Sequence, residues 1–394
     1  MALIDWLTLS LTPGIGPILS RRIIEAVGGD VAAACTVSLA VLRNVEGIGT
    51  NKADKIAAGL RAARPLALAQ ADKAAAMNVR IICTEDDDYP LLLREIPDPP
   101  MVLYLRGDLQ PRDLHAVAIV GSRKCSLYGR EQADRFGALL AGAGVTIISG
   151  GARGIDSAAH RGAMTHPAGR TIAVLGSGVD VPYPPENAAL FDTIARGRGA
   201  VVSEFPLGTQ PTPENFPRRN RVVSGMSRGV VVIEADERSG ALITARQAAD
   251  DHNRTVFALP GRVDNALSAG PHKLIRDGAT LVRNLEDVLE GLTPLPAQAS
   301  EVREIAPGLF HEETPTAVVQ PAPHVSIEPI APNVTPQQSR ILEQLDSQPM
   351  TVDQLIEQTA LPASAILQEL TILSLRVFVK RVDGQTYVKG KAAR

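Results

Sequence analysis

The sequence has few cysteines, few aromatic residues and no long apolar run, and these shortages exclude several classes of protein. The three cysteines, Cys35, Cys83 and Cys125, stand far apart and form no CxxC pair, which excludes a disulfide framework and a cysteine-rich zinc site. No stretch approaches the ~18 apolar residues of a membrane span. The first residues lack the basic start of a signal peptide. We therefore expect a cytoplasmic protein with no membrane segment.

Neither sign of charge is in large excess. The 394 residues include 40 Lys and Arg against 43 Asp and Glu, for a net charge of −3, so any nucleic-acid site must be a local basic patch. Hydrophobic residues make up 45% of the chain, which indicates globular domains rather than disorder. Aromatic residues make up only 3%, so a ring beside a basic cluster is informative.

Composition divides the chain into four parts. Residues 1–71 are Ala-rich and predict an all-α domain, in which two Gly-hydrophobic-Gly turns, Gly14–Gly16 and Gly47–Gly49, each precede a helix with basic residues. Such turns resemble helix-hairpin-helix motifs, whose free N–H groups meet phosphates. Tight turns in a small helical domain that binds no DNA are the alternative. Residues 292–334 are rich in proline and predict an extended linker.

Residues 72–291 predict a doubly wound, Rossmann-like α/β domain. Short β-branched runs without polar alternation, such as Val117–Val120, Val145–Ile148 and Val230–Ile233, are typical of a parallel sheet covered on both faces. Helical segments separate them, for example Gly129–Ala141 and Thr244–Asp251.

Residues 335–394 predict a winged-helix domain of three helices and a hairpin. Thr335 and Pro336 begin the first helix, Thr351 caps the second, and Pro362 opens the third. Two strands around Asp383-Gly384 complete the pattern.

Glycine-rich loops follow the strands that end at Val120, Ile148 and Leu175. In open α/β sheets ligands bind beyond the carboxyl ends of the strands, where glycine turns and helix N-termini attract anions. Arginines add full charge to two of the loops. The residues that we predict to bind an anion, most plausibly phosphate, are Gly121, Ser122, Arg123, Ser126, Gly150, Gly151, Arg153 and Gly154.

The densest basic segment is Asn215–Arg228, with four arginines and no acid. Guanidinium groups suit phosphate oxygens, and an aromatic ring beside them can stack on a base, which is the combination that single strands need. We therefore add Phe216, Arg218, Arg219, Asn220 and Arg221 to the predicted DNA site. A surface helix whose arginines pair with acids such as Glu204 and Glu214 is the alternative.

Patterns for cofactor, metal and catalytic sites are missing. No GxGxxG follows the relevant strands, no GxxxxGK[ST] occurs, and His160 and His166 do not share a helix face. We expect no cofactor, no metal and no catalytic residue. Acids such as Asp156 and Glu234 are expected to cap helices or orient arginines.

Several motifs together resemble the DNA-processing protein DprA (Smf) family over about residues 75–290. They are Val120–Arg123 with Tyr128-Gly129, Ser149–Asp156, Val174–Asp180 with Tyr183, Pro184 and Asn187, Ser203–Pro206, Phe216–Arg221, Ser239–Thr244 and Phe257–Gly261. The resemblance implies a non-enzymatic protein that binds single-stranded DNA, shields incoming DNA during natural transformation and loads the RecA recombinase on it, displacing single-strand binding protein. It also implies a homodimer formed through the Rossmann-like domain.

Two features depart from the family pattern. Arg153 stands where the family often has lysine, and the predicted third helix of the winged-helix domain, Pro362–Leu375, has no Lys or Arg and one acid, Glu369. A helix that reads the major groove should carry basic and amide side chains. We therefore expect an accessory or protein-contact role for this domain rather than transcription regulation.

An enzyme of the related Rossmann group that hydrolyses nucleotides at the glycosidic bond is the alternative function. That group shows Gly-Gly-x-Gly-Thr followed by a glutamate. Here Thr244 continues into Ala245-Arg246-Gln247 without one.

Overall fold

The computed structural model describes residues 2–292 and, in the C-terminal part, residues 336–345, 349–359, 361–362, 366, 369–370, 373, 378–381 and 386–389. The chain forms two compact units, residues 1–312 and 313–394, which are described separately. The predicted linker 292–334 lies outside the described residues except for Leu292. None of the described helices combines the length and apolar character needed to cross a bilayer.

The N-terminal residues are helical, as predicted, and the described part of this region forms five helices. They are α1 (Ala2–Leu11), α2 (Pro17–Ala26), α3 (Val31–Cys35), α4 (Leu39–Asn44) and α5 (Thr50–Ala76). Gly14 and Gly47 adopt φ of +85° and +87°, which favours glycine, and the isoleucine that follows each is buried. Helix α2, which follows the first turn, contacts the second turn, because the Arg22 guanidinium donates to the Glu46 carbonyl at 3.0 Å. DNA binding by these turns stays a prediction.

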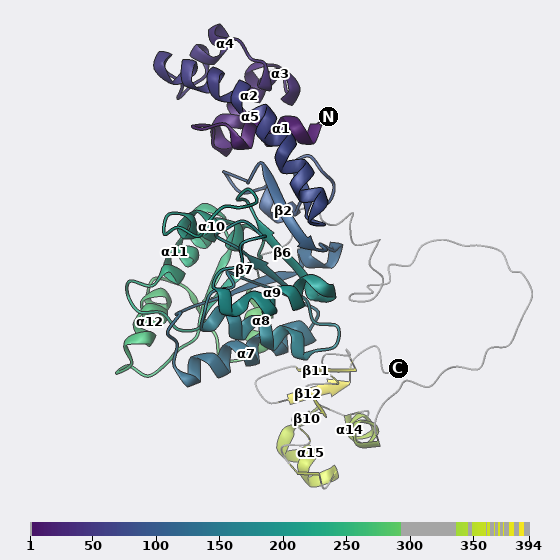
Figure 1. Cartoon of the computed structure of the whole chain (residues 1–394). Helices are drawn as coiled ribbons and strands as arrows, with labels where there is room; N and C mark the ends of the chain where they lie inside the picture. Colours follow the sequence, from purple (N-terminus) through teal and green to yellow (C-terminus); the bar gives the residue numbers. More distant parts are fainter. Residues whose placement is uncertain are drawn as a thin grey trace, which may run out of the picture. The chain divides into compact units, whose positions relative to one another are not determined.

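Helix α5 joins the helical region to the sheet domain and crosses the predicted boundary at residues 71–72 (Figure 1). Gln70 exchanges two hydrogen bonds with the backbone of Leu207, and Lys73 Nζ lies 2.8 Å from Asp180 Oδ2. One apolar core runs from Trp6 in α1 to Tyr104 in the sheet. The two regions therefore pack as parts of one compact unit.

The centre of the first unit is a nine-stranded sheet in the order β1-β2-β6-β5-β4-β3-β7-β8-β9. Its strands are β1 (Arg80–Cys83), β2 (Val102–Gly107), β3 (Ala116–Val120), β4 (Thr146–Ser149), β5 (Thr171–Val174), β6 (Gly199–Ser203), β7 (Gly229–Val232), β8 (Thr255–Ala258) and β9 (Thr280–Leu281). The pairs β1/β2 and β2/β6 are antiparallel, and all other pairs are parallel. This confirms the predicted Rossmann-like sheet.

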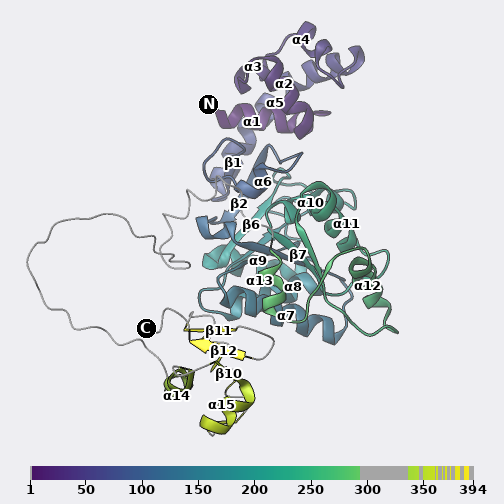
Figure 2. The ribbon, with the colours of Figure 1, turned by 180° about the vertical axis from the view of Figure 1, so that it is seen from behind.

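Helices cover both faces of the sheet, as Figures 1 and 2 show. They are α6 (Leu91–Arg94), α7 (Leu127–Gly142), α8 (Ile155–Thr165), α9 (Ala188–Thr193), α10 (Asn215–Gly225), α11 (Gly240–Arg246), α12 (Ala269–Arg276) and α13 (Leu285–Glu290). Val117 and Ile119 of β3 pack with α7 and α8, whereas Ala118 and Val120 belong to the core with α10 and α11. This burial of both faces explains why β3 has no polar alternation.

The strand order reverses between β3 and β7. The chain adds β4, β5 and β6 on one side of β3 and then returns through α10 to place β7 on the other side. In doubly wound folds such a reversal opens a crevice at the carboxyl ends of the two strands. The predicted anion loops follow β3 and β4 at this edge.

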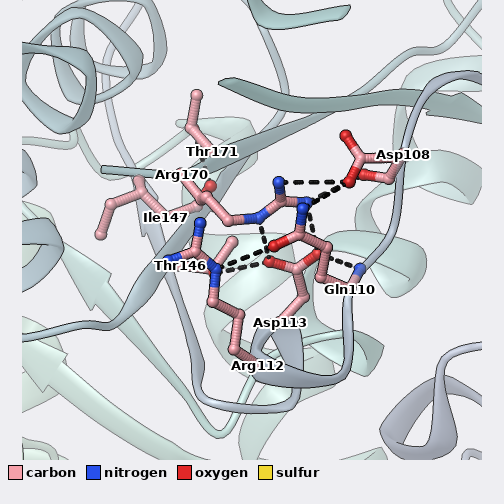
Figure 3. A network of polar contacts seen from close by, with 8 residues as sticks. All are labelled: Asp108, Gln110, Arg112, Asp113, Thr146, Ile147, Arg170 and Thr171. Carbon is pink, nitrogen blue, oxygen red and sulfur yellow. Dashed lines mark hydrogen bonds and ion pairs between the residues drawn. The ribbon is translucent and has the colours of Figure 1, made fainter. Parts of the chain in front are cut away.

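At the opposite, amino-terminal edge of the sheet, a buried ion pair fixes the short helix η1 (Pro111–Leu114) to the strands (Figure 3). Arg170, which is 4% exposed, donates from Nε and Nη2 to the two carboxylate oxygens of Asp113, both at 2.8 Å. Its Nη2 also bonds the Asp108 carbonyl at 2.9 Å, and its Nη1 lies 3.4 Å from the Asp108 carboxylate. Thr146 and Gln110 donate to Asp113 as well. Burial lowers the pKa of Arg170, but the bond and charge of Asp113 outweigh it and raise that pKa.

The second unit has the predicted arrangement of helices followed by a hairpin. Its elements are α14 (Pro336–Leu345), β10 (Met350–Thr351), α15 (Val352–Thr359), β11 (Val379–Arg381) and β12 (Thr386–Lys389). Thr351 caps α15 as predicted, because its hydroxyl accepts from Gln354 N–H while its own N–H donates to Gln354 Oε1. Of the predicted third helix, Pro362 is described and is not helical, and Ile366, Glu369, Leu370 and Leu373 are described and are helical. The two-residue strand β10 was not predicted.

Candidate nucleic-acid interface

A cavity of about 340 Å³ lies where the strand order reverses. The loops after β3, β4 and β7 and the first turns of α10 surround it. Its lining residues include Gly121, Ser122, Arg123, Lys124, Gly150, Ala152, Asp156, Phe216, Pro217, Arg219, Asn220, Asp236, Ser239, Gly240 and Thr244. The position is the one that the topology predicts for a ligand.

The loop after β3 presents Arg123 and Lys124 to solvent at the cavity. Gly121 is the first residue of the loop, and the position has no room for a side chain. A Cβ there would lie 2.6 Å from Ile155 Cγ1 and 2.8 Å from the Glu234 carbonyl oxygen. Ser122 N–H donates to that carbonyl at 2.7 Å, and the Ser122 hydroxyl accepts from Lys124 N–H at 3.1 Å. The start of the loop is therefore fixed, and the Arg123 and Lys124 side chains are exposed at its tip.

The loop after β4 packs closely against its neighbours. Gly151 and Gly154 adopt φ of +67° and +75°, in the region that favours glycine. Asn187 holds the loop from below, since its Nδ2 donates to the Gly151 carbonyl at 2.9 Å and to Ser157 Oγ at 2.8 Å. Asp156 accepts from Ala152 N–H at 3.2 Å, and burial raises the pKa of this carboxyl. Hydrogen bonds to the backbone therefore fix the shape of this loop. The Arg153 side chain extends away from it and forms an ion pair with Glu186.

Arg219 is a buried cation without a carboxylate partner among the described residues. It is 5% exposed, and its Nη1 donates to the carbonyls of Gly150 and Val174, while its Nε has no partner. The guanidinium lies against the Gly150 backbone, so a Cβ at that position would displace it. Burial is the main cause that lowers the pKa of Arg219 to about 10, with Asp156 acting against it. A buried charge that only the nearby Asp156 carboxylate partly offsets, without an ion pair, can attract a ligand of opposite sign at a cavity.

Arg221 and Arg218, in contrast, already have partners elsewhere. The side chain of Arg221 is 9% exposed and forms an ion pair with Glu204, and its Nε lies 3.4 Å from Asp98 Oδ2. This is the alternative that the sequence left open for the basic segment. Arg218 is exposed and lies with Cζ 5.2 Å from the centre of the Phe205 ring. Neither residue lines the cavity.

Phe216 is half-buried at the cavity and supports Arg123. The Arg123 Cζ lies 4.8 Å from the centre of the Phe216 ring, which is cation–π distance. The Tyr183 ring is 5.7 Å away at a tilt of 38°. A Cβ on Gly176 would lie 2.9 Å from Phe216 Cδ1, so the ring also packs on that backbone. The ring therefore holds a guanidinium plane over the cavity rather than standing fully exposed.

The structure brings together about half of the residues predicted for the site. Those that line the cavity are Gly121, Ser122, Arg123, Gly150, Phe216, Arg219 and Asn220. Those that lie outside its lining are Ser126, Gly151, Arg153, Gly154, Arg218 and Arg221. Ser126 caps α7 and bonds Glu234, and Gly151 and Gly154 shape the loop beneath. A ligand-binding role for each of these residues stays a prediction.

Several residues that line the cavity were not predicted from the sequence, among them Lys124 and Asp236. Lys124 stands directly after Arg123 in the sequence, so its charge was a usable signal. Asp236 and Ser239 follow β7, whose place beside β3 no sequence pattern reveals. Among the residues that the structure describes, no cluster of three His, Cys, Asp or Glu side chains could hold a metal ion. The arrangement is a cationic cleft with an aromatic support.

Known proteins of one family resemble this chain in sequence and fold. Residues 80–293 match the family described as DNA recombination-mediator protein A, and residues 325–385 match the DprA winged helix domain. Protein Smf of Synechocystis is 34% identical over 393 residues, 97% of each chain. The DNA processing protein DprA of Streptococcus pneumoniae is 45% identical over 204 residues, 52% of this chain and 71% of that protein.

A solved structure shows the same fold. The X-ray structure of DNA processing protein A from Streptococcus pneumoniae superposes with a TM-score of 0.59 at 34% identity, covering 73% of this chain and 98% of that one. The match to the winged-helix family confirms the predicted C-terminal domain. Sequence, cleft and fold lead to one conclusion: the chain belongs to the DprA (Smf) family of DNA recombination-mediator proteins.

Proposed function

We propose that the cleft beyond β3, β4 and β7 binds single-stranded DNA and that the protein acts without catalysing a reaction. The observation that carries the proposal is the Arg123 guanidinium, which lies exposed on the Phe216 ring at 4.8 Å. Within the described part of the chain no carboxylate forms an ion pair with it. An exposed guanidinium on an aromatic support can meet a phosphate with its edge or a base with its face.

A single strand fits this cleft better than a duplex does. Bases of a duplex are stacked on one another, so a guanidinium plane or ring cannot stack on them, whereas a single strand exposes every base face. Arg219 adds a second positive charge at the cavity floor, and Lys124 adds a third at the rim. Positive groups lie both at the rim and at the floor of the cavity. This arrangement suits a single strand that places a phosphate and a base in the cavity together.

We further propose that the protein is a recombination mediator in natural transformation. It would shield incoming DNA, displace single-strand binding protein and load RecA, working as a homodimer formed through the Rossmann-like domain. Membership of the recombination-mediator family supports this role. RecA filament formation on strands coated with single-strand binding protein should accelerate when the protein is added. Sedimentation of the free protein should show a dimer.

A binding titration tests the DNA site. Arg123→Ala should weaken binding to labelled oligothymidine about tenfold, the loss of one charge-assisted contact. The slope of log affinity against log salt should become shallower by about 0.7. Arg196→Ala is the matched control, because Arg196 is an exposed arginine just before β6, at the opposite edge of the sheet. Equal affinity of Arg123→Ala and wild type would remove the cleft from the proposal.

The non-enzymatic part has its own test. The protein is incubated with nucleoside monophosphates, and free base is measured by chromatography. We expect no release above the background of protein-free buffer. Base release that disappears in Asp156→Asn would favour a hydrolase instead, because Asp156 is the buried carboxyl that lines the cavity.

A further inference from the structure

The N-terminus of α7 is occupied by a carboxylate of the protein itself. Glu234 follows β7, is 2% exposed, and reaches across to the neighbouring strand's loop. Its Oε2 accepts from Ser126 N–H at 2.8 Å, and its Oε1 accepts from the Ser126 hydroxyl at 2.6 Å. That hydroxyl accepts in turn from Gly129 N–H at 3.0 Å. The Ser126 hydroxyl therefore caps the first turn of α7, and the Glu234 carboxylate lies behind this cap as an internal anion.

The surrounding backbone is shaped around this carboxylate. A Cβ at Gly129 would collide with Glu234 Oε2 and lie 3.0 Å from its Cγ. Glycine at position 129 therefore leaves room for the side chain of Glu234. The Glu234 carbonyl also accepts from Ser122 N–H at 2.7 Å. One residue thus holds both ends of the loop that carries Arg123.

In doubly wound proteins the N-terminus of the helix after the strand at the reversal is where a nucleotide phosphate binds. Here α7 is that helix, and a buried negative charge already lies against its dipole. A free phosphate would meet both a filled space and a charge of its own sign. The nearest positive groups that remain for an anion are on the loop tip and the cavity floor, at Arg123 and Arg219.

We propose that Glu234 is a specificity-determining residue, which closes the nucleotide-phosphate position at α7 so that the cleft excludes free nucleotides and accepts only a phosphate at Arg123. The inference rests on the proposed function for the identity of the strand that is accepted. It assigns to Glu234 the rejection of free phosphate, mononucleotides and dinucleotides. The Glu234 carboxylate would then explain two features together: the glycine at position 129, which leaves room for it, and the missing GxGxxG pattern, which a closed phosphate position does not need.

The test measures melting of the full chain with and without inorganic phosphate and AMP. Glu234→Ala removes the internal anion and opens the space that it fills. Phosphate and AMP should raise the melting temperature of this variant by ~2–4 °C more than that of wild type. Glu237→Ala is the matched control, because Glu237 is an exposed glutamate in the same segment after β7. A folded Glu234→Ala protein that responds to both anions no more than wild type does would overturn the proposal.

A second variant keeps the proposal testable if Glu234→Ala does not fold. Glu234→Gln keeps the shape and one acceptor but removes the charge, so its affinity for oligothymidine should rise about twofold at low salt. A purely structural role predicts an equal or lower affinity, and either result would overturn the proposal. Failure of wild type to bind oligothymidine would reject the proposed function alone, because the anion-dependent melting of Glu234→Ala is read without DNA.

Discussion

Two buried arginines at opposite edges of the parallel sheet, Arg170 and Arg219, differ in what they bond. At the amino-terminal edge Arg170 meets the carboxylate of Asp113 with two donors at 2.8 Å and is further bonded by Asp108 (Figure 3). At the carboxyl-terminal edge Arg219 meets only carbonyl groups, and its Nε has no partner. The pKa of Arg170 is raised and that of Arg219 is lowered.

The difference teaches how to separate a structural charge from a binding charge. Burial removes both guanidinium groups from water. Only Arg170 recovers the lost stabilisation inside the protein, from its ion pair with Asp113. Arg219 keeps part of its bonding capacity, and it faces a cavity where a phosphate can supply what the fold does not. At the strand ends where topology places a ligand, the charge of Arg219 is left without an ion pair.

Removing Arg170 should have the largest effect, and on stability alone. Arg170→Met leaves the Asp113 carboxylate buried without its partner, which should lower the free energy of unfolding by about 3–5 kcal/mol. Urea denaturation measures this loss. Arg106→Met is the control, since the Arg106–Asp192 pair is partly exposed and should change stability by less than ~1 kcal/mol.

The affinity of the Arg170→Met protein for oligothymidine, measured under conditions where it remains folded, should equal that of wild type. A parallel loss of affinity and stability would show that the two edges of the sheet are coupled, and the comparison would fail.

Removing Arg219 should lower the affinity for DNA and change the stability of the protein only slightly. Arg219→Met leaves two carbonyls without a donor but also removes a poorly compensated charge, so the unfolding free energy should change by only ~1 kcal/mol. Affinity for oligothymidine should fall about tenfold. Arg219→Lys, which keeps the charge but not the planar fork, should retain part of the affinity. If Arg219→Met instead unfolds as readily as Arg170→Met does, Arg219 is a structural residue.

Much of the fold could be predicted from the sequence, because β-branched runs and capping residues act locally. Two short features depended on tertiary context instead. The strand β10 has only two residues, and its identity comes from pairing with β12. Helix α5 continues past residue 71 because its last turns pack on the sheet domain through Gln70 and Lys73.

The site could be predicted only in part, for a similar reason. Arg123 follows a strand directly, so its place at the cavity was readable from the sequence. Arg219 and Arg221 lie on the same helix two positions apart, and no local pattern tells which one meets a carboxylate. Glu204 decides that from another strand end. The role of Glu234 depends on β3 and β7 being neighbours, although they are distant in the chain.

The smallest effect should come from Phe216, and it concerns how the exposed arginine at the cleft is held. The ring already has Arg123 over it and the Gly176 backbone against it, so a base has little open ring surface to stack on. We expect the base to stack on the guanidinium plane instead, with the ring as its support. Phe216→Leu keeps most of the packing and removes the π face. It should weaken oligothymidine binding by ~0.5–1 kcal/mol, the size of a cation–π contact near the surface.

A double-mutant cycle with Arg123→Ala and Phe216→Leu separates the two accounts, with melting curves as the control for folding. If the ring acts through Arg123, Phe216→Leu should cost nothing once Arg123 is gone, and the coupling energy should equal its whole effect. Direct stacking of a base on the ring predicts instead a loss of ~1–3 kcal/mol that persists in the Arg123→Ala background. The salt slope adds an independent criterion, because a ring that only supports the guanidinium leaves the number of phosphate contacts unchanged and so leaves the slope unchanged.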